Sequence, residues 1–353
     1  MLKTFFLLDP CDFHSHFRNG DMMRAVLTYM VQAFVYILGM PNTDPPLLTG
    51  DDACEYDAEL RRVHREDLVV CDLEFEPLVS IQITPETTPK MIYQAATRGV
   101  RSGKLYPRNV TSFSHFGITD YRAVRLLSVF AAMEKCGMIA QFHPEHPDPS
   151  VEGMLKEQAF IAVLQWIREH FPQLKIVVEH VTSEVMINWV KQQDPHYVRA
   201  TLAVHYMLID HGHVNGYEAE YGNKGRADLM CKPCPKLRHD RQAILEAALS
   251  GDPHFFYGGD NAPHPRHAKH IEIACGVYNG PVALQTLVEL FETAGKLERL
   301  QDFVSTFGRE FYNVPGVGRQ VTLVREPWVV PSIYPGDVVP FRNGQTIQWQ
   351  IIS

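Results

Sequence analysis

Apolar and polar positions form two patterns along the chain: short apolar runs, and longer segments with apolar residues at helical spacing. The runs have the length of buried strands, and the segments between them have the length of amphipathic helices. The predicted strands span residues 4–8, 33–40, 78–84, 99–106, 138–143, 175–180, 198–204 and 254–259. The predicted helices span residues 21–31, 51–65, 85–97, 119–135, 151–170, 183–193 and 239–249.

Strands that alternate with helices predict right-handed crossovers and a parallel sheet. In a chain of 353 residues, eight such strands favour closure into a TIM (β/α)8 barrel of the α/β class. We expect a single domain over residues 1–353, in which residues from about 281 to 353 form a small C-terminal extension of helices and short strands packed on the barrel. A doubly wound open sheet is the structural alternative, but no GxGxxG motif follows the first predicted strand.

Polar side chains gather at the carboxyl ends of these predicted strands, where barrels place their active sites. The first strand is expected to run into His14 and His16, whose imidazoles point the same way because they are two residues apart. Imidazole pairs bind zinc, and Arg18, next on that face, suits an anionic substrate. The other polar residues at strand ends are Asn42, Lys104, His143, His180, Asp260 and His264. A single polar residue at a strand end more often has a structural role, but so many of them at the same end of the barrel predict a metal site.

The number of candidate ligands indicates two metal ions. Four histidines and one aspartate exceed the three protein ligands that a catalytic zinc keeps. Two divalent ions about 3.5–4 Å apart need a bridging ligand, which should be anionic, and together they activate water near neutral pH. Lys104 can supply that bridge if CO2 adds to its amine and forms a carbamate. Its charge alone would favour the alternative, a lysine that binds substrate.

The composition of the chain limits the kinds of binding partner and the cellular location that we expect. The net charge of −8 and the lack of a Lys/Arg cluster argue against binding to nucleic acid. No apolar run approaches the roughly 18 residues of a membrane span, and residues 1–5 do not read as a secretory signal. Seven cysteines, an odd number, are typical of reduced thiols, so we expect a cytoplasmic protein. Cys231 and Cys234 form a CxxC, a weak zinc or redox signal that we interpret as loop thiols.

A series of motifs extends over nearly the whole chain. In order they are DFHSHFRNGDMM, GMPNTDPP, GKLYPRNVTS, FHPEH, KIVVEHVTS, LMCKP, GGDNAPHPRH, CGVYNGPVAL and VVPFRNGQTIQW. Together they resemble the short bacterial dihydroorotases of the amidohydrolase superfamily. The resemblance implies a TIM barrel with two zinc ions that reversibly cyclises N-carbamoyl-L-aspartate to L-dihydroorotate in de novo pyrimidine biosynthesis, and it also implies a homodimer.

The resemblance assigns roles to residues at matching positions. The more buried metal would be held by His14, His16 and Asp260, and the other by His143 and His180, with carboxylated Lys104 as the bridge. Asp260 would also carry the proton between the activated water and the ring nitrogen. The substrate's α-carboxylate would lie against Arg18, Asn42 and His264, and the backbone at Lys232 and Cys275 would hydrogen-bond the ring amide. Thr111 and Ser112 belong to a loop, residues 108–115, that is expected to close over the substrate.

A few positions depart from the family's pattern without removing a ligand. Pro144 follows His143 where glycine is usual and could re-aim that ligand, while Asn261 and Cys275 replace a more usual serine and alanine. Two other functions stay open. Hydantoinases and dihydropyrimidinases share the metal ligands but usually lack an arginine placed like Arg18. A non-catalytic scaffold for aspartate transcarbamoylase would typically have lost metal ligands.

Overall fold

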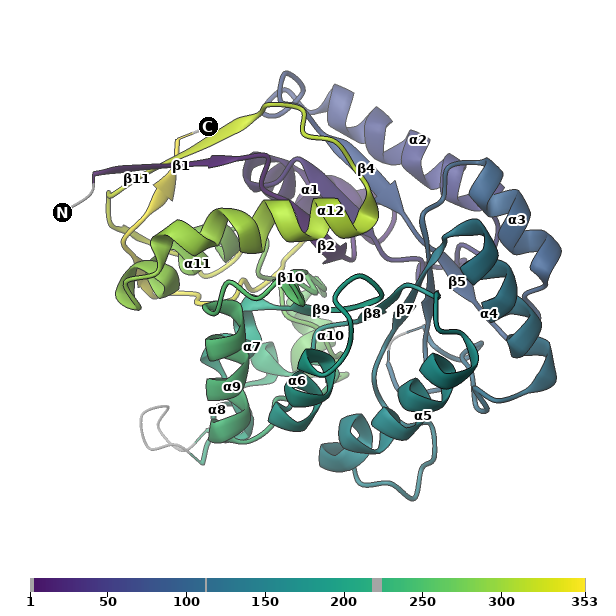
Figure 1. Cartoon of the computed structure of the whole chain (residues 1–353). Coiled ribbons are helices and arrows are strands. Elements are labelled where there is room, and N and C mark those ends of the chain that lie inside the picture. Colours follow the sequence, from purple (N-terminus) through teal and green to yellow (C-terminus); the bar gives the residue numbers. More distant parts are fainter. Residues whose placement is uncertain (1–2, 112, 218–223, 353) are drawn as a thin grey trace.

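A closed ring of parallel strands forms the centre of the molecule (Figure 1), as predicted. The computed structural model describes residues 3–111, 113–217 and 224–352. One sheet runs β2-β3-β4 and the other β5 to β10, and the chain passes directly from β4 to β5 through Ser80. The ring closes where Ser15 bridges Asn261 and the Gly259 N–H donates to Asp12. The strands are β2 (Asp12–Ser15), β3 (Tyr36–Gly39), β4 (Glu76–Val79), β5 (Ile81–Ile83), β6 (Ser102–Leu105), β7 (Ile139–Phe142), β8 (Ile176–Val178), β9 (Val198–Leu202) and β10 (Phe255–Tyr257).

Amphipathic helices follow the strands and cover the outside of the ring (Figure 1). In the first of them Met23, Val26, Leu27 and Met30 are buried, at the spacing of one helical face. Thr49 begins the second by accepting a hydrogen bond from the Asp52 N–H in a capping box. The helices are α1 (Gly20–Ala33), α2 (Gly50–Glu66), α3 (Pro89–Thr97), α4 (Val124–Cys136), α5 (Lys156–His170), α6 (Glu184–Lys191), α7 (Val204–Leu208), α8 (His211–Asn215), α9 (Arg238–Ala248) and α10 (Arg266–His270), with 3-10 turns η1 (Gly153–Leu155) and η3 (Ala227–Leu229).

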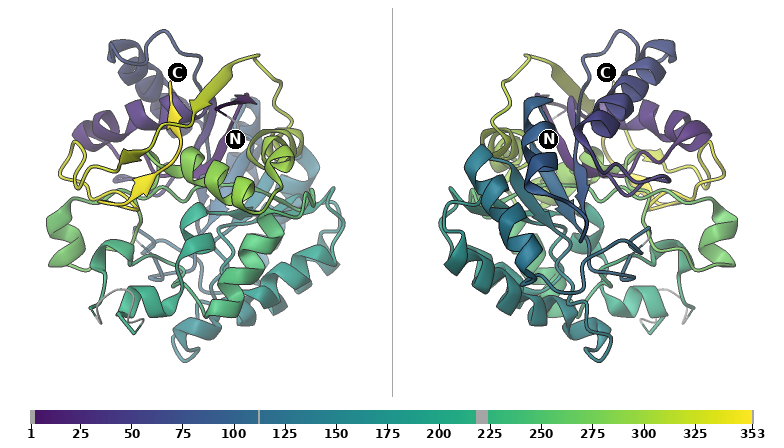
Figure 2. Two further views of the ribbon diagram at one scale, coloured as in Figure 1. Left: turned by 90° about the vertical axis from the view of Figure 1, so that its left-hand side faces the viewer. Right: turned by 90° about the vertical axis from the view of Figure 1, so that its right-hand side faces the viewer.

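The first predicted strand is wrong as a barrel strand. Residues 4–8 form β1 (Thr4–Leu8), which pairs antiparallel with β11 (Gln320–Val324) outside the barrel. The chain turns at Asp9, which has φ +48 and accepts hydrogen bonds from the N–H groups of residues 317–319, before Pro10 leads into β2. Figure 2 shows both chain ends beside this small sheet, which β14 (Gln350–Ile351) completes; β12 (Trp328–Val329) and β13 (Thr346–Ile347) form a separate pair.

The amino-terminal end of the barrel is covered by α12 (Phe307–Tyr312). Three cations at the starts of barrel strands donate to its carbonyls: Arg101 to Tyr312, Lys175 to Phe311 and Arg199 to Phe307, at 3.3, 3.2 and 2.6 Å. Cations are favourable beside the last carbonyls of a helix, which have no partner within it, and those of Phe311 and Tyr312 are of this kind. This cover leaves the carboxyl ends of the strands as the open end. Before α12 come α11 (Ala283–Thr293), the 3-10 turn η4 (Leu297–Arg299) and the π-helical turn η5 (Asp302–Thr306).

The two faces of each barrel strand meet different surroundings, as β7 illustrates. Ala140 and Phe142 pack into the apolar layer between strands and helices, whereas Ile139 packs into the cluster that contains α12. Because side chains alternate, Gln141 and His143 follow Ile139 on the inner face. The strand therefore leads from an apolar floor through a buried amide to an imidazole at its carboxyl end.

Candidate functional site

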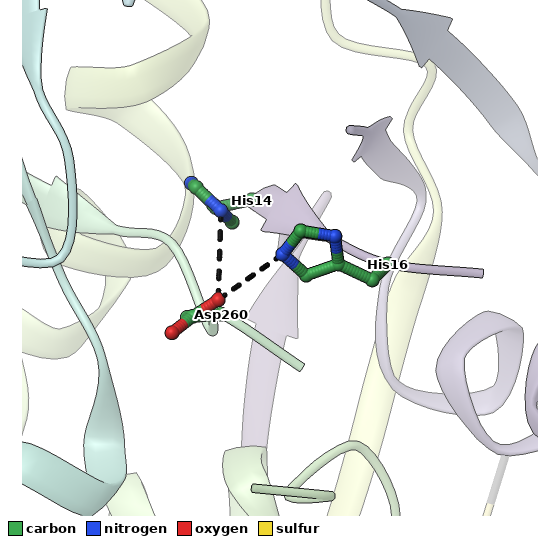
Figure 3. A group of neighbouring side chains, drawn as sticks. All are labelled: His14, His16 and Asp260. Carbon is green, nitrogen blue, oxygen red and sulfur yellow. Dashed lines mark ion pairs between the residues drawn. The ribbon is translucent and has the colours of Figure 1, made fainter. Parts of the chain in front are cut away.

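Three of the predicted ligands converge at the carboxyl end of the barrel (Figure 3). The Nε2 atoms of His14 and His16 lie 3.6 and 3.3 Å from Oδ1 of Asp260, and all three side chains are buried. His14 and His16 come from the end of β2, and Asp260 follows β10, so barrel closure brings them together. Ligand atoms within 4.8 Å of one another, two nitrogens and one carboxylate oxygen, fit a zinc-like ion.

The other two predicted histidines lie beside this group. The His180 ring is 4.9 Å from that of His14 and 4.7 Å from that of His143, measured between centroids, and both side chains are buried. Nδ1 of His180 is buried and has no hydrogen-bond partner among the described residues. The structure thus gathers four imidazoles and one carboxylate, as the sequence led us to expect. Their roles as ligands stay a prediction.

Two buried carboxylates decide which nitrogen of two rings is available. Nδ1 of His14 lies 2.8 Å from Glu179 Oε2, and Nε2 of His143 lies 2.8 Å from Glu145 Oε2. When ionised, the two carboxylates only accept, and each of these ring nitrogens then carries the proton. The lone pair is then on Nε2 in His14 and on Nδ1 in His143. Such carboxylate–histidine pairs typically orient metal-binding imidazoles and raise their basicity.

Pro144 lies in the turn between His143 and Glu145, and its fixed φ suits that turn. The Glu145 N–H donates to the His143 carbonyl at 2.8 Å, an i to i+2 bond that closes a γ-turn with Pro144 at its centre. The inverse form of this turn needs φ near −75°, close to the value that proline fixes. The departure from glycine therefore favours the fold that brings Glu145 back to the His143 ring.

A network of buried polar side chains inside the barrel hydrogen-bonds Glu179. Its Oε1 accepts from Gln141 Nε2 at 2.6 Å, and its Oε2 accepts from Thr201 Oγ1 at 2.6 Å as well as from His14. The Ser80 hydroxyl donates to Gln141, and the Ser102 hydroxyl lies 2.6 Å from that of Ser80. This network joins residues of six strands or strand ends around the barrel. It holds the carboxylate, and through it the His14 ring, in one orientation.

Lys104, on β6, is fully buried inside the barrel. Its Nζ has no hydrogen-bond partner among the described residues, and it lies 5.3 Å from the centre of the Tyr106 ring. Burial lowers the pKa of Lys104 from 10.5 to about 8, which increases the fraction of neutral amine at pH 7. A buried amine without a partner is unfavourable, and its neutral form is the one that reacts with CO2.

The protonation of the histidines also fits a cation. Burial lowers the pKa of His14, His16 and His180 well below 6.5, so each ring is neutral at pH 7. Burial raises the pKa of Asp260 to about 6, with nearby cationic groups opposing the shift. Neutral imidazoles and a carboxylate that is costly to bury are the donor set that a divalent ion stabilises.

Three of the candidates adopt left-handed backbone conformations. Arg18, His180 and Asp260 have φ of +61, +37 and +44. Non-glycine residues in this region cost on the order of 1–3 kcal/mol each, and such strain is found preferentially at functional sites.

A small pocket lies beside the Asp260 group. Arg18 Nη2 is 3.1 Å from His264 Nε2, while Arg18 Nη1 is buried with no partner among the described residues. His264 Nε2 also lies 3.0 Å from the Cys275 carbonyl, and Asn42 Oδ1 accepts from Tyr106 Oη at 2.9 Å. Ser112 lies outside the described residues. The pocket is lined by His16, Arg18, Asn42, Thr111, Lys232, Asp260, Ala262, Cys275 and Gly276.

Sequence reasoning missed the supporting residues Glu145, Glu179 and Asn261. Two signals were available, since Glu145 is two residues after His143 and Glu179 directly precedes His180. Asn261, noted only as a departure, accepts from the N–H groups of Asn279 and Gly280 through Oδ1 at 3.1 and 2.9 Å. It thereby fixes the backbone directly after Asp260.

Outside this site, the described residues offer no alternative group of candidate ligands in a cavity. A larger cavity of about 540 Å³ lies between α9 and α11, but it contains none of the candidate ligands. All seven cysteines are free, including Cys231 and Cys234. Among the described residues, no helix combines the length and hydropathy that crossing a membrane requires.

Comparison with known proteins agrees with the geometry, although no protein-family model matches the chain. The sequence is 37% identical over 358 residues to a dihydroorotase of Halorhodospira halophila, with 99% of each chain covered. It is 35% identical over 344 residues to a probable dihydroorotase of Schizosaccharomyces pombe, with 96% of each covered.

Solved structures give the same result. The dihydroorotase of Saccharomyces cerevisiae superposes with a TM-score of 0.88 at 29% identity, covering 99% of this chain and 98% of that one. For the Campylobacter jejuni enzyme the TM-score is 0.89 at 28% identity, with 100% and 99% covered. An L-hydantoinase of Arthrobacter aurescens, at 14% identity and a TM-score of 0.77 with 99% and 83% covered, shares the fold. The chain therefore belongs to the dihydroorotase family of hydrolases that act on cyclic amides.

Proposed function

We propose that this protein is a two-zinc dihydroorotase that interconverts N-carbamoyl-L-aspartate and L-dihydroorotate in de novo pyrimidine biosynthesis. The observation that carries the proposal is the juxtaposition of a buried His14–His16–Asp260 donor group with a pocket that contains the Arg18 guanidinium. The donor group suits metal-assisted attack on an amide. The guanidinium suits a ring that bears a carboxylate.

The residues divide into two sets of ligands. His14, His16 and Asp260 would hold one zinc ion, and His143 with His180 the other. When bound, the ions would act as Lewis acids and lower the pKa of water toward neutrality. Glu179 and Glu145 would keep the His14 and His143 rings turned toward the ions.

Lys104 would become the anionic bridge. Its neutral amine would attack CO2, form an N–C bond and release a proton, leaving a carbamate with two oxygens. The lowered pKa of Lys104 and its buried Nζ support this role, because an ammonium between two cations would repel both.

The substrate would lie with its α-carboxylate against Arg18, Asn42 and His264. Arginine binds carboxylates through two parallel hydrogen bonds, and Arg18 Nη1 has no partner among the described residues. The backbone N–H groups of Lys232 and Cys275 would hydrogen-bond the ring, and Thr111, which lines the pocket, would contact the ligand as the loop closes. The yeast neighbour was solved in complex with 5-fluoroorotic acid, a carboxylated pyrimidine.

Asp260 would move the reaction's proton. In hydrolysis it would accept a proton from the attacking water and deliver it to the leaving ring nitrogen, and in cyclisation it would act in the opposite order. Burial raises the pKa of Asp260 to about 6, which brings the carboxyl group nearer to working pH.

The alternative functions find less support. A hydantoinase would not need the Arg18–His264 pair. The hydantoinase neighbour shares the fold with this chain, but its sequence is only 14% identical. A non-catalytic scaffold would not need the six candidate ligands that remain here. A cytoplasmic location and a homodimer, implied by the resemblance, stay predictions.

Metal analysis combined with turnover tests the proposal. We expect the purified protein to contain about two zinc ions per chain and to convert substrate in both directions. Prolonged chelation should abolish activity, and zinc with bicarbonate should restore it. Protein without metal or turnover after growth in zinc-replete medium would favour the scaffold, and turnover of hydantoin without dihydroorotate would favour a hydantoinase.

Glu179→Gln tests the orientation of His14. An amide would place an N–H against the donors that now surround this carboxylate, so we expect zinc affinity to fall about 10–100-fold. Competition with a chromophoric chelator measures this affinity. The matched control is Glu157→Gln, since the hydrogen bonds that buried Glu157 accepts from described residues come from Thr182 and Ser183 and not from a candidate ligand. Equal zinc affinity in the two variants would contradict the role of Glu179.

A further inference from the structure

A buried lysine lies next to the two chain segments that line the pocket. Lys269, on α10, has only 3% of its surface exposed. Its Nζ donates to the carbonyl oxygens of Met230, Ala274 and Gly276 at 2.6, 2.9 and 2.7 Å. All three partners are acceptors only, so the nitrogen must supply three N–H groups. The side chain is therefore an ammonium, although burial opposes its charge.

The three carbonyls belong to the two segments that line the pocket. Ala274 and Gly276 are the neighbours of Cys275, and Met230 is two residues before Lys232. The Gly276 N–H also donates to the Met230 carbonyl at 2.9 Å, so the two segments are joined both directly and through the ammonium. The Cys275 carbonyl between them faces His264 at 3.0 Å.

The surroundings of Gly276 show how tightly this region is packed. Gly276 has φ +154, and a Cβ at this position would lie 2.4 Å from the Ala262 carbonyl oxygen. The segment around Cys275 is thus pressed against the chain just after Asp260. Of the three carbonyls turned toward the ammonium, that of Ala274 shares a peptide plane with the Cys275 N–H, so the hydrogen bond from Lys269 fixes the direction of that N–H.

We propose that Lys269 is a positioning residue for substrate binding: its ammonium holds the backbone at Cys275 and Lys232 in the register that presents both N–H groups to the ring amide. The inference rests on the proposed function, in which those two N–H groups bind the substrate. Lys269 itself does not line the pocket. It acts through the segments that do.

The test compares lysine-to-methionine variants at two sites. Lys269→Met keeps the unbranched stem and removes the ammonium, so we expect KM to rise at least tenfold while kcat changes less than about threefold and zinc content stays the same. The matched control is Lys175→Met, which removes another ammonium bonded to a backbone carbonyl, Phe311, at the opposite end of the barrel. Its KM should match the wild type. Lys269→Arg, which keeps the cation and its donors, should restore most of the affinity.

Three results would overturn the proposal. The first is the same KM in Lys269→Met and Lys175→Met, and the second is loss of zinc together with KM, which would make Lys269 part of the metal site's support. If Lys269→Met yields no folded fraction on size-exclusion chromatography, Lys269→Gln takes its place; failure of both to fold would assign Lys269 to stability alone. An inactive wild type that is folded and loaded with zinc would instead contradict the proposed function.

Discussion

Lys104→Ala is expected to lose the pair of bound zinc ions together with nearly all turnover. The side chain is fully buried, its nitrogen has no partner among the described residues, and it lies among the histidines and carboxylates of the site. Removing it would leave the two proposed cations without a bridging anion, and their mutual repulsion would then be uncompensated. Elemental analysis and steady-state kinetics measure the two losses on one sample.

Two further measurements separate the carbamate from a simple charge at this position. Lys104→Arg keeps a cation but cannot form this carbamate, so it should be as inactive as Lys104→Ala. A small carboxylic acid in the buffer should partly restore zinc and turnover to Lys104→Ala, because it can enter the space and supply the missing anion. An active Lys104→Arg variant would show that the residue acts as a cation, and the bridge hypothesis would be wrong.

Asp260→Asn is expected to lower kcat by about three orders of magnitude. Proton transfer by a positioned side chain contributes roughly 10²–10⁴-fold, and this carboxylate also lies 3.3–3.6 Å from two imidazole nitrogens. The amide keeps the shape but can neither accept the proton nor neutralise a cation. We expect the loss in both directions of the reaction, since in the proposed mechanism the same carboxylate would carry the proton each way.

The matched control for this variant is Asp210→Asn. Asp210 is also buried, and it begins α8 by accepting from the N–H groups of Gly212 and His213. The same substitution there should lower the melting temperature and leave kcat unchanged. Turnover of Asp260→Asn within a few-fold of the wild type would remove Asp260 from the proton path.

Most of the barrel could be predicted because its strands are buried on both faces and read as apolar runs. The exception was residues 4–8, whose apolar character equals that of a barrel strand. What distinguishes them is the turn at Asp9 and a partner in β11, more than 300 residues away, and neither is visible in the local pattern. Helix ends were predicted within a few residues, except at the starts of α3, α4 and α5, where turns precede the first α-helical residue.

The candidate ligands could be predicted because they fall at strand ends, where the fold itself brings them together. Glu145 and Glu179 lie close to histidines in the sequence, but that signal does not identify the partner, since Glu179 precedes His180 and yet hydrogen-bonds His14. Lys269 was invisible for another reason: a lysine on a short polar helix reads as a surface residue. Only the three-dimensional arrangement of the Met230, Ala274 and Gly276 carbonyls shows that it is buried and bonded.

The closure of the barrel sets the order in which this site can be built during synthesis. The bond between Asp12 and Gly259 joins residues 247 positions apart, a distance that a ribosome adding about 5–20 residues per second covers in roughly ten to fifty seconds. Throughout that interval β2 has an unpaired edge, and His14 and His16 lack the Asp260 carboxylate. A nascent chain therefore cannot assemble the full set of candidate ligands before β10 leaves the exit tunnel, so binding of the proposed metal ions would be a late step in the formation of each molecule.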